Sequence, residues 1–224
     1  SQKLQIQVDF MEANPDFAIC HHSSLVVYEN GERESHLMSA EQKEIMTLED
    51  FVASRSNCIL TASSLFRNHL FDDYPTWAMG LKLGDWVLHV LNAQHGKIKF
   101  INRTMSVYRI HSSGIWSRKK TIEKITQFAE AVEACKIHFA PRAETEFNDF
   151  LAQLYANICF HYFQDGKYSD FLGNYAKCRN YWTLLPRRSQ FALLCRKVLS
   201  TIPLLAKAYN YLTTTIRKNN FRYA

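Results

Sequence analysis

The strongest constraint on the fold is a change in sequence pattern near Trp116. Before this residue, short runs of β-branched and aromatic side chains alternate with stretches of helical periodicity, which is typical of a domain with both strands and helices. After it, apolar residues recur at helical spacing through every long segment. We therefore expect an α/β domain over residues 1–116 and an all-α extension over residues 117–224.

The ends of individual elements carry local signals. Thr47 and Asp50 have the spacing of a capping box, Asp85 suits the first turn of a helix, and Gly96 suits a helix end. In the first part, we expect helices at residues 3–13, 47–55 and 85–94, and strands at residues 17–20, 25–28, 58–66, 97–102 and 105–110. In the second part, we expect helices at residues 121–139, 143–163, 168–184 and 189–216, separated by Pro141, Asp165-Gly166 and Pro186.

The two parts differ in charge as well as in pattern. The whole chain carries a formal net charge of +6. Residues 1–115 hold 10 Lys and Arg against 13 Asp and Glu, a net charge of −3, whereas residues 116–224 hold 17 against 8, a net charge of +9. Such an asymmetry predicts different partners for the two parts, and phosphates or an anionic surface for the second.

The cysteines indicate a reducing compartment. All six lie far apart, with no Cys-x-x-Cys pair, so the sequence predicts neither a disulfide framework nor a zinc site built from them. The apolar stretches fall short of the ~20 residues that span a bilayer. We therefore expect a cytoplasmic protein, with peripheral association at the inner face of a membrane as an option.

Common ligand fingerprints do not occur in the chain, but an ordered set of weaker motifs does. The sequence has no Gly-rich dinucleotide motif, phosphate-binding loop or His-Glu-x-x-His. The ordered motifs are Val27-Tyr28-Glu29-Asn30-Gly31, Gly84-Asp85-Trp86, and Tyr108-Arg109-Ile110-His111. With them, residues 1 to about 117 resemble the C-terminal half of a bacterial family 2 glycosyltransferase of polysaccharide biosynthesis. That resemblance implies an incomplete GT-A-like mixed sheet.

Asp85 is the candidate catalytic base under this resemblance. In such enzymes an acceptor hydroxyl attacks the anomeric carbon of a nucleotide-sugar, and a carboxylate takes the hydroxyl proton. The family places that carboxylate where a helix begins, and Asp85 matches the position. A helix N-terminus favours the ionised carboxylate. The alternative is that Asp85 is simply a helix N-cap.

Arg109 and His111 are the candidates for the leaving diphosphate. The resemblance implies an imidazole near the metal or the diphosphate at the place of His111, so His111 is the candidate metal ligand and Arg109 a candidate phosphate partner. The implied cofactor is a divalent cation, Mn²⁺ or Mg²⁺, bound mostly by the half of such enzymes that precedes this stretch. The alternative for His111 is a histidine hydrogen-bonded within a loop.

Ser64 and Trp86 are the remaining candidates for substrate binding. Ser64 belongs to a Ser- and Thr-rich stretch that faces the acceptor under the resemblance, and Trp86 has a ring that stacks on a sugar face. For both residues a place in the core is the open alternative. His21, His22 and His89 are expected to be structural, because no second ligand of matching spacing accompanies them.

The resulting hypothesis is an inverting glycosyltransferase fragment that lacks the donor-binding half. Its substrates would be a nucleotide-sugar donor and a glycan or lipid-linked acceptor, and the fragment alone would be inactive. The alternative is a non-catalytic interaction module whose helical part binds a protein partner.

A basic, apolar tail follows Pro186. Residues 187–224 contain eight Lys and Arg and no acidic residue, interleaved with many large apolar side chains. Such a composition is typical of a helix that lies on an anionic membrane surface. The alternative is a helix packed on its own domain with solvated cations. Nucleic acid is not an expected partner, because long aliphatic runs dilute the basic residues.

Overall fold

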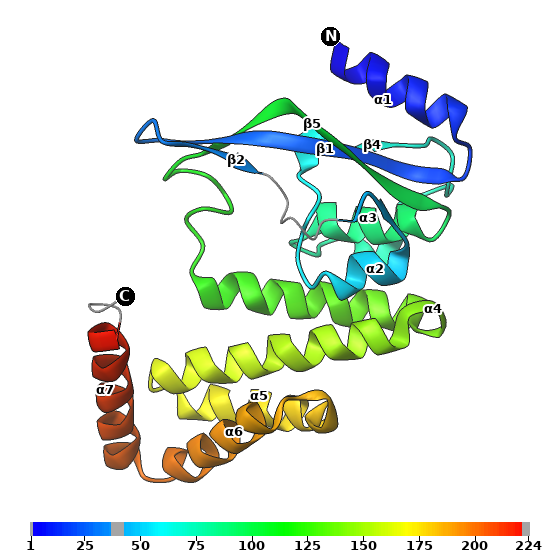
Figure 1. Ribbon diagram of the computed structural model, residues 1–224. Helices are drawn as coiled ribbons and strands as arrows, with labels where there is room; N and C mark the ends of the chain where they lie inside the picture. Colours follow the sequence, from blue (N-terminus) through cyan, green and yellow to red (C-terminus); the bar gives the residue numbers. More distant parts are fainter. Residues whose placement is uncertain (1, 37–42, 221–224) are drawn as a thin grey trace. The chain divides into compact units, whose positions relative to one another are not determined.

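The computed structural model describes residues 2–36 and 43–220, and the chain forms two compact units (Figure 1). One unit contains Ser1–Lys120 and Glu130–Phe150, and the other contains Thr121–Ala129 and Leu151–Ala224. The first unit is mixed α/β and the second is helical, as the sequence pattern predicts. The division differs from the expected boundary at residue 116 in one respect, because residues 130–150 join the α/β unit.

A mixed sheet forms the centre of the first unit. Its strands are β1 (Phe17–Tyr28), β2 (Arg33–His36), β3 (Ile45–Met46), β4 (Leu65–Phe66) and β5 (Lys97–Ile110). The order is β2-β1-β5-β3, and β4 pairs with β1. β1 and β5 are parallel to each other, whereas β2 and β4 pair antiparallel with β1, and β3 with β5. A parallel pair requires a crossover connection, and the helices α2 and α3 lie in it.

β1 and β5 are each one long strand, although the sequence predicts a break in both. They pair from Phe17 beside Lys97 to Tyr28 beside Ile110, with register shifts around His22 and Ser23. The middle of β1 is polar but fully buried, which is why its sequence resembles a connection. The Ser24 and Ser106 hydroxyls hydrogen-bond to each other across the pair at 2.6 Å.

Three helices cover the sheet in the first unit. They are α1 (Gln2–Ala13), α2 (Leu48–Ala53) and α3 (Gly84–Ala93). Figure 1 shows α1 over one face and α2 with α3 beneath the other. The predicted capping box is confirmed, because the Asp50 N–H donates to the Thr47 hydroxyl at 3.3 Å and the Thr47 N–H donates to the Asp50 carboxylate at 3.1 Å.

The prediction of one buried strand over residues 58–66 is wrong for most of that range. The range contains an irregular segment, the 3₁₀ turn Thr61–Ser63 and the two-residue strand β4. The Ser63 N–H and hydroxyl both donate to the Leu60 carbonyl, at 2.8 and 2.7 Å. Hydroxyl side chains that bond nearby backbone compete with sheet pairing, so a turn forms here.

Gly96 lets the start of β5 approach β1 closely. A Cβ atom at this position would lie 2.7 Å from the Asp16 carbonyl oxygen and 2.9 Å from the Ala18 nitrogen. The next residue, Lys97, donates its N–H to the same Asp16 carbonyl at 2.9 Å. The glycine is therefore required by a backbone contact, whereas α3 already ends at Ala93 with Gln94 as its C-cap.

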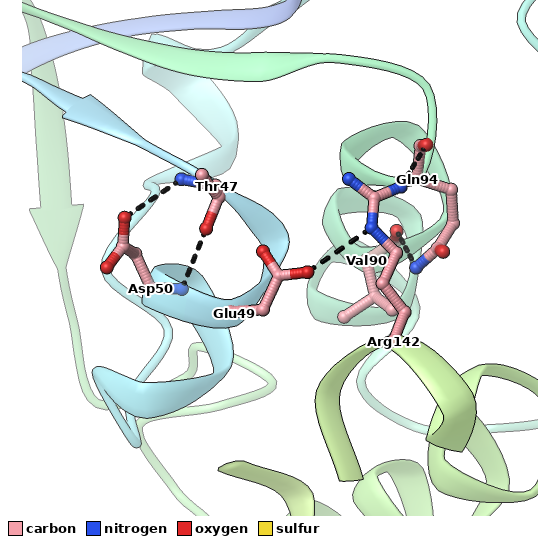
Figure 2. A network of polar contacts seen from close by, with 6 residues as sticks. All are labelled: Thr47, Glu49, Asp50, Val90, Gln94 and Arg142. Atoms are coloured by element: carbon pink, nitrogen blue, oxygen red, sulfur yellow. Dashed lines mark hydrogen bonds and ion pairs between the residues drawn. The ribbon is translucent and has the colours of Figure 1, made fainter. Parts of the chain in front are cut away.

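A segment of α4 (Thr121–Gln164) completes the core of the first unit. The Trp86 ring packs between Phe51, at 5.9 Å, and Phe150 of α4, at 6.2 Å between ring centroids. Arg142 of α4 pairs with the Glu49 carboxylate at 3.3 Å and donates to the Gln94 carbonyl (Figure 2). These contacts explain why residues 130–150 belong to this unit.

The second unit contains the rest of α4 together with α5 (Tyr168–Arg179), the 3₁₀ turn Trp182–Leu184, α6 (Arg187–Ser200) and α7 (Pro203–Asn220). The predicted separators are confirmed at Asp165-Gly166 and Pro186, and α4 has non-helical torsion angles at Ala143, just after Pro141. The predicted helix 189–216 is two helices, because Pro203 begins a new one. Within residues 2–36 and 43–220, no helix is both long and apolar enough to cross a bilayer.

Candidate functional site

Asp85 stands in the first turn of α3, where three donors hold its carboxylate. Oδ2 accepts hydrogen bonds from the Asn57 side-chain amide and from the Thr61 hydroxyl, both at 3.0 Å. Oδ1 accepts one from the Trp86 backbone N–H at 2.8 Å. Three donors of this kind fix both the position and the plane of the carboxylate.

Asp85 is not the N-cap residue of α3, although it accepts a hydrogen bond from the first-turn N–H of Trp86. Leu83 occupies the N-cap position, and its side chain makes no capping hydrogen bond. Asp85 is one residue inside the helix, close to the partial positive charge of the exposed N–H groups. The alternative of a simple N-cap therefore does not describe this residue.

Ser64 is connected to Thr61, whose hydroxyl contacts the same carboxylate. Its hydroxyl donates to the Thr61 carbonyl at 3.1 Å, while the Thr61 hydroxyl donates to Asp85. We name Asn57, Thr61, Ser64 and Asp85 the Asp85 cluster. The sequence pattern pointed to Ser64 and Asp85 but missed Asn57, which follows α2 with no distinctive spacing.

Trp86 does not serve the predicted role of stacking on a sugar. Its side chain is fully buried and contacts aromatic rings of the core on two sides. Trp86 lies about 100° around the helix from Asp85, and its ring packs on Phe51 and Phe150. The buried Trp86 ring therefore offers no face to a ligand.

Arg109 and His111 line an open pocket at the ends of the two long strands. The pocket has a volume of about 330 Å³, and its lining residues are Val27, Tyr28 and Glu29 from β1 and its end, with Arg109, Ile110 and His111 from β5 and its end. The parallel register places Val27 beside Arg109 and brings both strand ends to the same edge. Ligands of open α/β sheets commonly bind outside such carboxyl ends.

The pocket combines both signs of charge. Glu29 accepts hydrogen bonds from the Ser112 N–H at 2.9 Å and the Ser112 hydroxyl at 3.4 Å. These bonds, with a smaller contribution from His111, lower the pKa of Glu29. His111 contacts the Ser113 hydroxyl through Nδ1 at 2.9 Å and is exposed, as is Arg109. A ligand here meets a carboxylate, a guanidinium and an imidazole.

The described residues do not form a metal centre around His111. No group of three or more His, Cys, Asp or Glu side chains in this part of the chain has an arrangement that would hold an ion. The neighbour of the His111 ring is a hydroxyl, which is a poor ligand for Mn²⁺ or Mg²⁺ in comparison with a carboxylate. The described residues therefore supply no complete ligand set at His111, and its role as a metal ligand stays a prediction.

The histidines expected to be structural are buried in the first unit. His89, one turn after Asp85, lies between the rings of Phe51 and Phe66, at 5.8 and 5.7 Å. Burial lowers its pKa to about 4, although Asp85 acts in the opposite direction. His21 and His22 are buried in β1. All three histidines are therefore inaccessible to a ligand, whereas Asn57, Ser64 and Asp85 are half-buried and Thr61 is exposed.

Comparison with known proteins gives relatives whose activities are unknown. No family model matches the sequence, and no solved structure matches it. One uncharacterized protein of Mycobacterium bovis and two of Mycobacterium tuberculosis are each 34% identical over 115 residues. The match covers 51% of this chain and 32% of each relative, so the chain spans about a third of the length of these relatives.

Proposed function

We propose that this chain is the acceptor-side and catalytic-base part of an inverting glycosyltransferase that uses a nucleotide-sugar. The observation that carries the proposal is the Asp85 carboxylate, half-buried at a helix N-terminus and held by Asn57, Thr61 and the Trp86 N–H. Two side chains of the segment between α2 and β4, 28 and 24 residues before Asp85 in the sequence, donate to it. A first-turn acid does not need such donors to hold its helix end. Such a geometry is typical of a carboxylate that is positioned for proton transfer.

The hydrogen bonds define which oxygen would accept the proton. Oδ2 receives two donors from Asn57 and Thr61, whereas Oδ1 receives one from Trp86. Each carboxylate oxygen has two acceptor directions, so Oδ1 keeps one for an acceptor hydroxyl. As the hydroxyl oxygen bonds to the anomeric carbon, its proton passes to Oδ1, and the bond from that carbon to the diphosphate breaks with its electron pair leaving on the diphosphate.

The pocket at the strand ends suits the charged portion of a substrate. Arg109 supplies a permanent cation with a planar set of donors, which matches phosphate oxygens. Glu29 and the exposed serine hydroxyls of the loop after β5 suit the hydroxyls of a sugar. The divalent cation of the resemblance has no ligand set among the described residues, so no step of the proposed reaction depends on it.

Sugar binding tests the acceptor side directly. Amide NMR spectra of the full chain, recorded with a panel of monosaccharides and short glycans, should show saturable shifts at Asn57, Thr61 and Ser64. Thr61→Val removes one donor to Asp85 with little change of shape, and should weaken the binding by about three- to tenfold, the value of one hydrogen bond. Thr183→Val, at an exposed threonine of the second unit, is the matched control. The proposal would be contradicted if no sugar of the panel shifted the amide signals of the Asp85 cluster. It would also be contradicted if Thr61→Val and Thr183→Val changed the binding affinity equally.

A further inference from the structure

The helix α6 packs on the second unit through one side. Leu193 and Ser200 are buried, and the guanidinium of Arg196 lies 5.1 Å from the ring centroid of Phe160. At about 100° per residue, these three side chains of α6 share one side of the helix. The opposite side of a helix packed in this way is expected to be polar.

The opposite side of α6 is apolar instead. Phe191, Leu194 and Val198 are 69%, 47% and 66% exposed. They fall within an arc of about 60° whose centre lies roughly opposite the packed side. The exposed side chains are thus gathered on the face that points most directly away from the unit.

Exposed apolar side chains also follow α6 in the chain. Ile202, in the turn before α7, and Leu204 and Leu205 of α7 are 47%, 80% and 52% exposed, whereas Ala206 is fully buried. We name the six side chains Phe191, Leu194, Val198, Ile202, Leu204 and Leu205 the apolar strip. Exposed apolar side chains that gather along one segment are typical of an interaction site.

Cations border the apolar strip. Arg187 begins α6 on the side of the strip, and Arg188 and Lys197 lie about 90° to either side of its centre. All three are exposed, and so is Lys207 of α7. From residue 187 to the last residue, the sequence contains eight basic side chains and no acidic one. The strip is therefore complementary to an apolar surface that carries negative charge.

We propose that the apolar strip docks on the headgroup region of a membrane that contains anionic lipids. The strip offers aliphatic and aromatic side chains at its centre and no hydrogen-bonding group, so it fits an acyl boundary that makes no directional contacts. Its bordering arginines and lysines lie where phosphate and carboxylate headgroups meet an inserted helix. The inference stands on the second unit alone and does not depend on the proposed transferase activity.

Vesicle sedimentation tests the docking. The full chain should sediment with phosphatidylcholine vesicles that contain 30% phosphatidylserine at 50 mM NaCl, and at least tenfold less with pure phosphatidylcholine. Raising the salt to 500 mM should weaken the binding, because exposed charges are screened within about 3–5 Å at such ionic strength. Each cation near the surface contributes about fivefold in affinity, so Arg187→Gln with Arg188→Gln should weaken binding by about 25-fold.

A second pair of variants separates the strip from exposed apolar residues in general. Phe191→Ser with Val198→Ser should reduce vesicle binding at least tenfold, whereas Leu172→Ser with Leu184→Ser, which changes exposed residues of the same unit outside the strip, should keep it. A wild-type chain that stays in the supernatant at low salt overturns the proposal. Sedimentation of the Phe191 and Val198 variant at the wild-type level also overturns the proposal. A wild-type dimer that this variant converts to monomers overturns it too, because a second copy of the chain would then cover the strip.

Discussion

Acid is expected to destabilise the first unit because two of its buried histidines are neutral in the folded state. Burial, with His89 and His22 nearby, lowers the pKa of His21 to about 3. Burial also lowers the pKa of His89 to about 4, against the opposing effect of Asp85. Both side chains are 1% exposed, and among the described residues His21 Nε2 and His89 Nδ1 have no hydrogen-bond partner. Protonation of either ring would place a charge in this core.

The sign and size of the effect follow from the difference between the two states. In the unfolded chain a histidine titrates near 6.5, so at lower pH the unfolded state binds more protons than the folded state and the free energy of unfolding falls. Below pH 6.5, each histidine lowers the free energy of unfolding by about 1.4 kcal/mol per pH unit, until the pH reaches its folded-state pKa. Between pH 7.5 and 5.5 the two histidines should together remove about 2–3 kcal/mol, a large fraction of the ~5–15 kcal/mol of a typical domain.

Urea denaturation followed by far-UV circular dichroism at pH 7.5, 6.5 and 5.5 measures this loss. His89→Leu should reduce the loss by about 1.4 kcal/mol, because one buried imidazole that resists protonation is then removed. The new side chain is apolar, as are the rings of Phe51 and Phe66 on either side. His95→Gln, at an exposed histidine just after α3, should keep the wild-type pH dependence. A free energy of unfolding that is constant from pH 7.5 to 5.5, or an identical slope in His89→Leu, would refute the reasoning.

Two further experiments test the packing of the first unit, the first with a control glycine in the second unit. Gly96→Ala should destabilise the fold by about 1–3 kcal/mol, because the new methyl group meets the Asp16 carbonyl. Gly173→Ala, which has open space in a helix, should stabilise it by up to ~1 kcal/mol. Thermal or urea unfolding measures the free energy of unfolding of both variants. A double-mutant cycle of Arg142→Gln and Glu49→Gln should give a coupling of about 0.2–1 kcal/mol, and a coupling of zero would show that this exposed pair does not hold the α4 segment in place.

The helices were predictable because their ends have local chemistry. Thr47 and Asp50 satisfy each other's backbone N–H groups, and Pro186 directly precedes the first residue of α6. The strands were less predictable, since the polar residues in the middle of β1 resemble a loop until β5 pairs with them. Sheet pairing between residues about 80 apart has no local signal in one sequence.

The site was predictable only in part. Asp85 and Ser64 carry enough local pattern to be singled out, and Thr61 contacts both, Asp85 through its hydroxyl and Ser64 through its carbonyl. Asn57 was missed because its role depends on where a loop folds back onto α3. Trp86 was assigned to the substrate because periodicity does not distinguish a ring in the core from a ring at a surface; only burial does. The same holds for the segment 130–150, whose packing on the α/β unit is not encoded in its helical pattern.

Turnover by an Asp85 variant tests the central claim most directly. In the full-length gene product, release of nucleoside diphosphate is measured with a panel of nucleotide-sugars and glycan acceptors for wild type, Asp85→Asn and Asp50→Asn. Asp50 is also a carboxylate in a helix first turn, but it belongs to the capping box of α2. Asp85→Asn should lower kcat by about 10²–10⁴-fold with the fold and KM retained, while Asp50→Asn keeps the wild-type kcat. Wild-type turnover in Asp85→Asn, equal losses in both variants, or a wild-type protein that consumes no nucleotide-sugar would contradict the account.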